Sequence, residues 1–348
     1  MAGQPRRHYM LQTLSKSILL LLLSVVICCI LYPFVLWVIG QAAFPFQANG
    51  SLLGGPDGKI VGSRLIAQPF TKDEYFQPRP SAASYDASAS ASSSLAASNY
   101  ALRDRVARTL GPIAKYRSGP KAGQLVAADT ESWFQKDLFQ SKPHIVAQWA
   151  DMHNSLAQAW VKADPKNGAY VDGWAKAHPA VVAQWIKDNP GTPQPKADDL
   201  AVVFFENFSN ANPGKFPSPV TRKGADGKDQ TTIEPVKDGS DIQSIFFDMW
   251  RQDHPEADLQ DIPGDLVTTS GSGLDPHITL LNAEYQLDRV ASKWAANLKR
   301  DPTTVRKEIE EILQENASAP WFGLAGEKFV NVLEVNLKLR ERYGAPSP

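Results

Sequence analysis

Residues 270–277, Ser-Gly-Ser-Gly-Leu-Asp-Pro-His, hold the residue types in this sequence that are best suited to chemistry. Glycines that follow a strand can let backbone N–H groups converge on an anion, and the N-terminus of a following helix adds positive partial charge. Residues 266–269 are β-branched enough to predict a short strand, and a helix is expected soon after Pro276. Ser270, Gly271, Ser272 and Gly273 are therefore candidates for contact with an anion.

A structural role is the competing interpretation of the same residues. The glycines would supply positive φ in a tight turn, and Asp275 would cap the following helix with Pro276 at its first position. We favour this turn, because short Gly-rich motifs often match by chance. His277 beside Asp275 could form a dyad or bind a metal, but no second His or Cys stands at ligand spacing. We therefore expect a buried or interface hydrogen bond at His277, and no metal site.

Several classes of protein are excluded by what the sequence lacks. Ser81, Ser270 and Ser272 have no Gly-x-Ser-x-Gly turn or Ser-x-x-Lys pair beside them, so we expect no hydrolase activity. The sequence has neither a phosphorylatable Asp in an Asp-Lys-Thr-Gly context nor a Gly-x4-Gly-Lys-Ser/Thr loop. Lys plus Arg is 36 against 37 for Asp plus Glu, which argues against nucleic acid as a partner. We expect no catalytic residues and no cofactor of the protein's own.

The N-terminal region predicts a membrane anchor. Residues 17–40 are apolar and uncharged, and a spanning helix needs about 20 such residues. Lys16 precedes this run and the next charge is Asp57, so residues 1–16 should stay cytoplasmic and the chain from residue 41 onward should be exported. A cleaved signal peptide is the alternative, but its apolar stretch would be only about 7 to 15 residues. Pro33 should bend the helix, and Trp37 suits the outer interface.

The first exported segment predicts a hairpin and then a loop. Residues 52–53 and 60–66 flank a Gly-Pro-Asp-Gly turn signal. A long Ser/Ala tract follows without apolar periodicity, and a short helical pattern begins at about Leu102 and ends at about Leu110. The only cysteines, Cys28 and Cys29, lie in the apolar run, so the soluble part can hold no internal disulfide.

Ordered motifs in these segments identify a resemblance to a known family. They are Ala-x-Gly-Ser-Leu at 48–52, Val-Gly-Ser-x-Leu-Ile-x-Gln-Pro-Phe at 61–70, Tyr-Phe-x-x-Arg-Pro-Ser-Ala-x-x-Tyr at 75–85, and the blocks 266–291 and 326–339. In this order after a membrane helix they resemble the C subunit of the Kdp potassium-transporting P-type ATPase, the KdpC family. The resemblance covers residues 15–110 and 263–340, and departs from the family at Tyr100, where Pro is usual after Ser-Asn.

This resemblance implies an accessory, non-catalytic subunit of an ATP-driven, high-affinity potassium uptake complex. Its implied partners are a channel-like potassium-binding subunit, a P-type ATPase subunit and membrane lipid. The family is also described as a catalytic chaperone that raises the ATP affinity of the ATPase subunit, which makes residues 270–273 a candidate nucleotide or partner contact. The exported position of those residues opposes direct contact with cytoplasmic ATP. Further candidate partner contacts are Arg79, Pro80, Ser81, Asn99, Asp275 and His277.

The C-terminal segments predict two helices and a strand. Leu287, Val290, Trp294 and Leu298 lie at helical spacing within residues 282–298. Asp301 and Pro302 predict the start of a second helix that ends at about Asn316. Residues 330–339 alternate in polarity, with Val335 on the apolar side, and predict a half-buried strand that completes the sheet begun by the first hairpin.

Residues 113–261 lie outside the resemblance and contain six of the nine tryptophans. A pattern of Trp followed by Asp, His or Asn and then Pro recurs at Trp160, Trp174, Trp185 and Trp250, and Pro should end a helix after each of them. Residues 212–239 are rich in Pro, Gly and charge, and predict an exposed connection. The tryptophans could bind a partner or a sugar-like ligand, but we favour core positions because they share stripes with aliphatic residues.

The sequence thus predicts an α+β protein with one N-terminal transmembrane helix and an exported sheet-and-helix domain, residues 41–112 and 262–348. A mainly helical, Trp-rich insertion, residues 113–261, interrupts that domain. The protein should reside in the cell inner membrane as a single-pass protein with a periplasmic or extracellular C-terminal domain. The alternative function is a free-standing, membrane-anchored extracytoplasmic ligand-binding protein.

Overall fold

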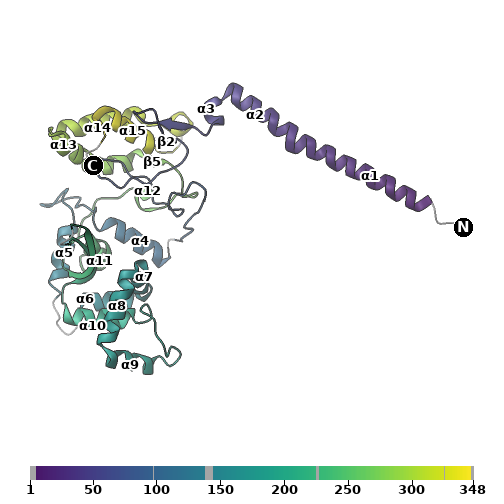
Figure 1. The fold of residues 1–348 in the computed structure, drawn as a ribbon. Coiled ribbons are helices and arrows are strands. Elements are labelled where there is room, and N and C mark those ends of the chain that lie inside the picture. Colours follow the sequence, from purple (N-terminus) through teal and green to yellow (C-terminus); the bar gives the residue numbers. More distant parts are fainter. Residues whose placement is uncertain (1–4, 97, 138–143, 225–226, 325, 346–348) are drawn as a thin grey trace. The chain divides into compact units, whose positions relative to one another are not determined.

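The computed structural model describes residues 5–96, 98–137, 144–224, 227–324 and 326–345, which form two compact units (Figure 1). Unit 1 consists of residues 1–94 and 262–348, and unit 2 consists of residues 95–261. Unit 1 is therefore built from two separate stretches of chain. Unit 2 begins at Leu95, ahead of residue 113, where we expected the insertion to begin.

Unit 1 begins with a long apolar helix. It comprises α1 (Pro5–Val25), a π-helical turn η1 (Val26–Leu31) and α2 (Tyr32–Ala43). Among the described residues, the stretch Gln12–Ala43 is the one helix long and apolar enough to cross a membrane. The disturbance expected from Pro33 takes the form of the wide turn just before it, where the Tyr32 N–H bonds to the Ile27 carbonyl. This shift re-satisfies backbone groups that a proline would otherwise leave unpaired.

The predicted hairpin follows a short helix, α3 (Pro45–Ala48). Strands β1 (Leu52–Gly54) and β2 (Ile60–Ser63) pair antiparallel around the Gly-Pro-Asp-Gly turn, which confirms the prediction. The chain then runs without a described helix or strand to α4 (Tyr100–Leu110), so the predicted loop and short helix are also confirmed.

The second stretch of unit 1 supplies most of its core. It contains α12 (Gly264–Val267), β5 (His277–Thr279), α13 (Leu280–Leu298), α14 (Pro302–Asn316), the 3-10 turn η2 (Pro320–Gly323), β6 (Phe329–Asn331) and α15 (Val332–Tyr343). Both predicted helices are confirmed, and the Asp301 carboxylate caps α14 by accepting from the Thr304 N–H at 2.8 Å. Leu287, Val290 and Trp294 of α13 pack against Val305 and Ile309 of α14 and against α15 in one buried cluster.

The strand predicted at residues 330–339 is wrong. Only Phe329–Asn331 is extended, and it pairs with β5 and not with the first hairpin. Asn331 then caps α15, since its side-chain oxygen accepts from the Glu334 N–H at 3.2 Å. The alternating residues also fit a helix, because Val332, Val335 and Leu339 recur at spacings of three and four and are all buried. Leu337, which a strand would bury, is only half-buried.

Unit 2 is mainly helical around an aromatic core. Its elements are α4, α5 (Ala127–Gln135), α6 (Ile145–Met152), α7 (Asn154–Ala163), α8 (Pro165–Ala177), α9 (Pro179–Asp188), α10 (Ala201–Ala211), β3 (Phe216–Lys223), β4 (Asp229–Val236) and α11 (Ser240–Asp253). Trp149 is buried among Phe205, Phe216 and Phe246 with ring centroids 5.1 to 6.1 Å apart. All six tryptophans of the insertion are buried or half-buried against hydrophobic neighbours, so the core interpretation is confirmed.

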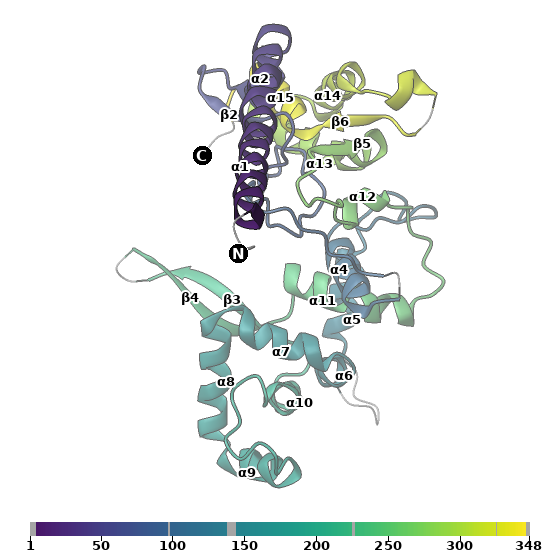
Figure 2. The ribbon, with the colours of Figure 1, turned by 90° about the vertical axis from the view of Figure 1, so that its right-hand side faces the viewer.

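The prediction that residues 212–239 lack strands is wrong, although most of the described residues in this segment are exposed, as expected. β3 and β4 lie side by side as one long antiparallel hairpin (Figure 2), with Val220 opposite Thr232 and Thr221 opposite Thr231. The β-branched residues favour the strands, whereas Pro217, Pro219 and Pro235 conceal the pattern. Proline is tolerated here because this two-stranded sheet consists entirely of edge strands.

The Trp-Pro pattern does mark helix ends, and the residue before Pro often supplies the cap. His178 Nδ1 lies 2.9 Å from the Trp174 carbonyl oxygen, and Asn189 Nδ2 donates to the Trp185 carbonyl oxygen at 2.9 Å. His254 repeats the contact with Trp250 at 2.8 Å. Each side chain satisfies a carbonyl that the end of the helix leaves without a partner.

Candidate functional site

Residues 266–277 form neither the predicted strand nor the predicted helix capped by Asp275. Residues 264–267 are a helical turn, α12, and Asp275 precedes a strand, β5. The Asp275 carboxylate accepts from the backbone N–H of His277 at 3.0 Å, so it stabilises the entry to β5. The next helix, α13, begins at Leu280 and is capped by Thr279, whose hydroxyl accepts from the Asn282 N–H. The expected helix N-terminus therefore does not follow the glycines directly.

The predicted tight turn is present, and its two glycines differ. Gly273 has φ +71°, and a Cβ there would lie 2.6 Å from the carbonyl oxygen of Ala91. A side chain at Gly273 is therefore excluded both by backbone conformation and by space. A Cβ at Gly271 would have no neighbouring heavy atom within 4 Å, so this residue faces open space. Gly273 is structural, whereas Gly271 lies on an accessible surface.

The segment around Arg79 and Ser81 packs against this turn. Arg79 Nη2 donates to the Thr269 carbonyl oxygen at 3.0 Å, and the Ser81 hydroxyl donates to the Gly273 carbonyl oxygen. The Tyr85 hydroxyl in turn donates to the Arg79 carbonyl oxygen at 2.9 Å. Two motifs about 190 residues apart in sequence therefore form one structure.

Most of the predicted site residues meet in one open depression of unit 1. Its lining consists of Leu65, Ile66, Arg79, Ser270, Gly271, Ser272, Leu274, Asp275, Pro276 and His277. Ser81 does not line the depression but bonds to the Gly273 carbonyl of the turn, and Pro80 lies between Arg79 and Ser81 in the chain. Asn99 is not part of it, because Asn99 belongs to unit 2 and caps α4 by accepting from the Ala101 N–H.

Asp275 Oδ1 lies 2.9 Å from His277 Nδ1, and both side chains are half-buried, so the hydrogen bond expected at His277 is present but is not a buried one. This bond, together with the backbone N–H of His277, lowers the pKa of Asp275 below its usual value. The imidazole also meets the Phe329 ring edge-on at 4.9 Å. His277 also lines a second depression, beside Arg64, Glu334 and Lys338, so its side chain borders both depressions of unit 1.

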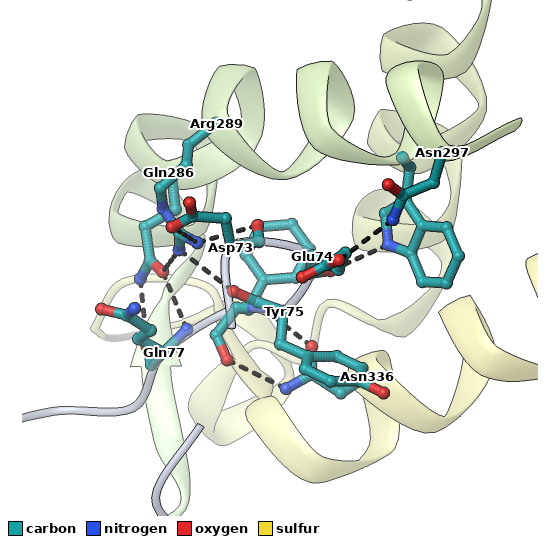
Figure 3. Close-up of polar contacts among 10 residues, drawn as sticks. Asp73, Glu74, Tyr75, Gln77, Gln286, Arg289, Asn297 and Asn336 are labelled. Carbon is teal, nitrogen blue, oxygen red and sulfur yellow. Dashed lines mark hydrogen bonds and ion pairs between the residues drawn. The ribbon is translucent and has the colours of Figure 1, made fainter. Parts of the chain in front are cut away.

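The Tyr-Phe segment upstream of Arg79 is held by two amide side chains (Figure 3). The Asn336 amide accepts from the Phe76 N–H and donates to the Phe76 carbonyl, both at 2.9 Å. The Gln286 amide does the same for Gln77, at 2.8 and 3.0 Å. Each side chain therefore replaces one residue of a neighbouring β-strand. We call this pair of contacts the amide clamp.

Further side chains of α13 bind the same segment. Arg289 donates to the carbonyl oxygens of Asp73 and Tyr75, at 2.9 and 3.0 Å. Trp294 Nε1 donates to the Glu74 carbonyl oxygen at 2.8 Å, and Asn297 donates to the Glu74 carboxylate at 3.0 Å. Residues 73–77 thus have almost all of their backbone partners on helices that lie more than 200 residues later in the chain.

Local sequence patterns do not identify this clamp, although the sequence contains one sign of it. Gln286 and Asn336 lie on the buried faces of α13 and α15, next to Leu287 and Val335. A polar residue within an apolar stripe must find a hydrogen-bond partner, because burying it without one is costly. A partner could therefore be expected, but the sequence alone does not say that it is residues 76–77.

In the part of the chain that the structure describes, these features define a class of protein with one candidate membrane helix and an α+β unit. Side-chain-to-backbone hydrogen bonds join the two halves of that unit. A family model described as K+-transporting ATPase, c chain (KdpC), matches residues 14–132 and 241–341. The chain belongs to the KdpC family.

Relatives named potassium-transporting ATPase KdpC subunit match the chain in part. The protein of Pseudomonas syringae pv. tomato is 45% identical over 111 residues, which is 32% of this chain and 58% of the relative. That of Clostridium botulinum strain Alaska E43 is 49% identical over 92 residues, 26% of this chain and 42% of the relative. That of Parvibaculum lavamentivorans is 33% identical over 118 residues, 34% of this chain and 63% of the relative. The chain spans about half the length of the curated relatives it matches.

Proposed function

We propose that this protein is an accessory, non-catalytic subunit of an ATP-driven potassium uptake complex. The observation that carries the proposal is the family match, which includes the apolar helix, the hairpin, the amide-clamped segment and helices α13 to α15. Relatives carry the name of a potassium-transporting ATPase subunit. The partners proposed for this chain are a channel-like potassium-binding subunit and a P-type ATPase subunit.

The proposed orientation places residues 1–16 in the cytoplasm and the chain from residue 41 onward outside it. Arg6, Arg7 and Lys16 precede the uncharged run at residues 17–40, and no charge follows that run until Asp57, which agrees with the positive-inside rule. In this orientation the helix packs among the spanning helices of the partners, while unit 1 rests on their outer face and supports assembly.

We further propose that the depression at residues 270–277 contacts a partner subunit. Gly271 and Ser272 are exposed at its surface, and the carbonyl of Gly273 is already bound by Ser81. On the exported side of the membrane this surface cannot meet cytoplasmic ATP. A chaperone-like increase in the ATP affinity of the ATPase subunit would therefore act through contact between the subunits. Direct binding of ATP at Ser270, Gly271, Ser272 and Gly273 would contradict this mechanism.

Two glycine variants separate the surface from the turn. Gly271→Val adds a side chain in open space, so it should leave the melting temperature unchanged while weakening co-purification with the pump subunits or raising the apparent KM for ATP. Gly273→Val, the matched comparison, should destabilise unit 1 because its Cβ meets backbone. Normal assembly and normal KM for ATP in a well-folded Gly271→Val protein would contradict a functional role for this surface.

A further inference from the structure

The segment that leaves the apolar helix carries an unusual set of exposed hydrophobic side chains. Phe44, Phe46, Leu52, Ile60 and Leu65 are 42% to 67% exposed in unit 1. We call these five residues the juxtamembrane patch. No charged residue occurs between Lys16 and Asp57, so the apolar character of the helix continues through α3 and β1.

Hydrogen bonds fix this patch to the end of the helix. The Asn49 side chain donates to the Pro45 carbonyl at 2.7 Å and pairs with the Gln41 amide on α2 at 3.3 Å. The Ser51 N–H donates to the Phe46 carbonyl at 2.9 Å. Gly50 and Ser51 both have positive φ, which turns the chain sharply back. The chain therefore folds onto the helix terminus and does not extend away from it.

The hairpin is tied into the same turn. The Ser63 hydroxyl donates to the Gly50 carbonyl at 2.7 Å, and the Arg64 N–H donates to the Ser51 carbonyl at 2.9 Å. Leu65 follows directly, with its N–H bonded to the Ser63 hydroxyl at 3.1 Å. These hydrogen bonds hold Leu52 and Leu65 near Ala43, the last residue of α2. Figure 1 shows α3 and β2 close together at this point.

The other face of the hairpin is bound to the body of unit 1. A Cβ at Gly62 would lie 3.0 Å from Leu333 of α15, so β2 approaches that helix closely. Arg64 forms an ion pair with Glu334 at 2.9 Å, and Asn331 donates to the Arg64 carbonyl at 2.8 Å. Leu52 lies opposite Ser63 in the ladder, one position from Gly62, and so points away from α15.

We propose that the juxtamembrane patch lies in the boundary between lipid headgroups and acyl chains, as a second contact with the bilayer. The occupant follows from position, because residues fixed to the end of a spanning helix are held at headgroup depth. Phenylalanine, leucine and isoleucine with a nearby basic residue, here Lys59, suit that layer. Because the hairpin is fixed to α15, this contact would set the orientation of unit 1 on the membrane.

The inference rests on the anchoring role proposed above, and spin-label accessibility can test the two separately. The full chain with Cys28→Ser and Cys29→Ser carries one cysteine label at a time, at Ile60, Leu65, Trp37 or Leu281. Trp37 lies within the apolar helix, and Leu281 is an exposed leucine of unit 1 outside the patch. Each labelled protein is reconstituted into vesicles of phosphatidylcholine and phosphatidylglycerol.

Collisions with oxygen report the apolar layer, and collisions with a nickel chelate report water. Labels at residues 60 and 65 should favour oxygen several-fold over the label at residue 281, with the label at residue 37 deepest. Labels at 60 and 65 that match 281 while 37 stays deep would overturn the inference and leave the anchor intact. An aqueous label at 37 would overturn the anchor itself. Shielding of 60 and 65 only after pump subunits are added would assign the patch to protein contact and overturn the lipid proposal.

Discussion

The two units hold their segments together by different kinds of contact. In unit 1, the clamp residues Gln286 and Asn336 bind the backbone of Gln77 and Phe76 across more than 200 residues of sequence. In unit 2, aromatic rings pack at 4.5 to 6.2 Å around Trp149, within one continuous stretch of chain. Hydrogen bonds with fixed geometry specify one pairing of distant segments, whereas ring packing is less directional.

The difference explains how a large insertion can be tolerated. Within unit 2, the segments near the two predicted ends of the insertion are held together, since the Gln260 N–H donates to the Lys115 carbonyl at 2.9 Å and the Arg117 N–H donates to the Asp258 carbonyl at 2.8 Å. On the other side of the boundary, the Ala91 N–H donates to the Ser272 carbonyl at 3.0 Å within unit 1. Within each unit, the chain before the insertion therefore bonds to the chain after it, so the halves of unit 1 can meet although many residues separate them in sequence.

The largest expected effect is on the core of unit 1. Val335→Asp places a charge at a fully buried position of α15 and should lower the stability of unit 1 by about 5 kcal/mol or more. Thermal melting followed by circular dichroism checks it, with Lys338→Asp as the exposed control on the same helix. An unchanged melting curve would show that Val335 of α15 does not lie in the core of unit 1.

Trp149→Ala should act on unit 2 alone. Removing a buried indole from the aromatic core should cost about 4 kcal/mol. If the units fold independently, calorimetry of this variant should show one transition shifted down and the other unchanged. Equal shifts of both transitions would show that the two cores unfold together, and would contradict independent folding of the units.

Asn336→Leu tests the clamp directly. It keeps a side chain of similar size but leaves the buried N–H and carbonyl of Phe76 without their partners, which should cost about 3 kcal/mol in unit 1. Gln314→Leu, on the exposed face of α14, is the matched control and should change stability little. A loss no larger than that of the control would show that the clamp is not what holds the two halves together.

The smallest effect concerns acid stability. Hydrogen bonds from Arg300 and from the Tyr343 hydroxyl lower the pKa of Glu308 to about 2, from an ordinary value of 4.5. Because the folded pKa is depressed, the stabilisation is fully present above pH 4.5 and is lost as pH falls toward 2.

Glu308→Gln should therefore lower stability by less than about 1 kcal/mol at neutral pH, as for a surface pair. The difference from the parent should close between pH 4.5 and 2 in urea unfolding. Glu311→Gln, an exposed neighbour on α14, serves as the control. A difference that stays constant down to pH 2 would contradict this assignment.

Sequence patterns predicted the elements whose signals are local. The apolar helix, the hairpin at Gly55-Pro56-Asp57-Gly58 and the helix capped by Asp301 each depend on neighbouring residues. Alternating polarity gave the wrong element at α15, because the same residues fit both a strand and a helix. The Asn331 cap favours the helix. Sequence patterns also failed at β3 and β4 because prolines in edge strands resemble a loop.

The candidate site was predictable only in part. The tight turn at Gly273 followed from its residue types, but its contacts with Ser81 and Ala91 join segments that local patterns cannot bring together. The same limit hid the pairing of Gln286 with residue 77. Long-range pairing depends on the whole fold, and no local spacing encodes it.

We propose that this chain, through its apolar helix and the rest of unit 1, is a subunit of a potassium pump. The most direct test is a gentle detergent pull-down through a C-terminal tag on the full chain, followed by potassium-stimulated ATPase assay of the eluate. We predict co-elution of a channel-like subunit and a P-type ATPase subunit with measurable activity. Elution of the chain alone, from membranes in which both subunits are present, would contradict the account.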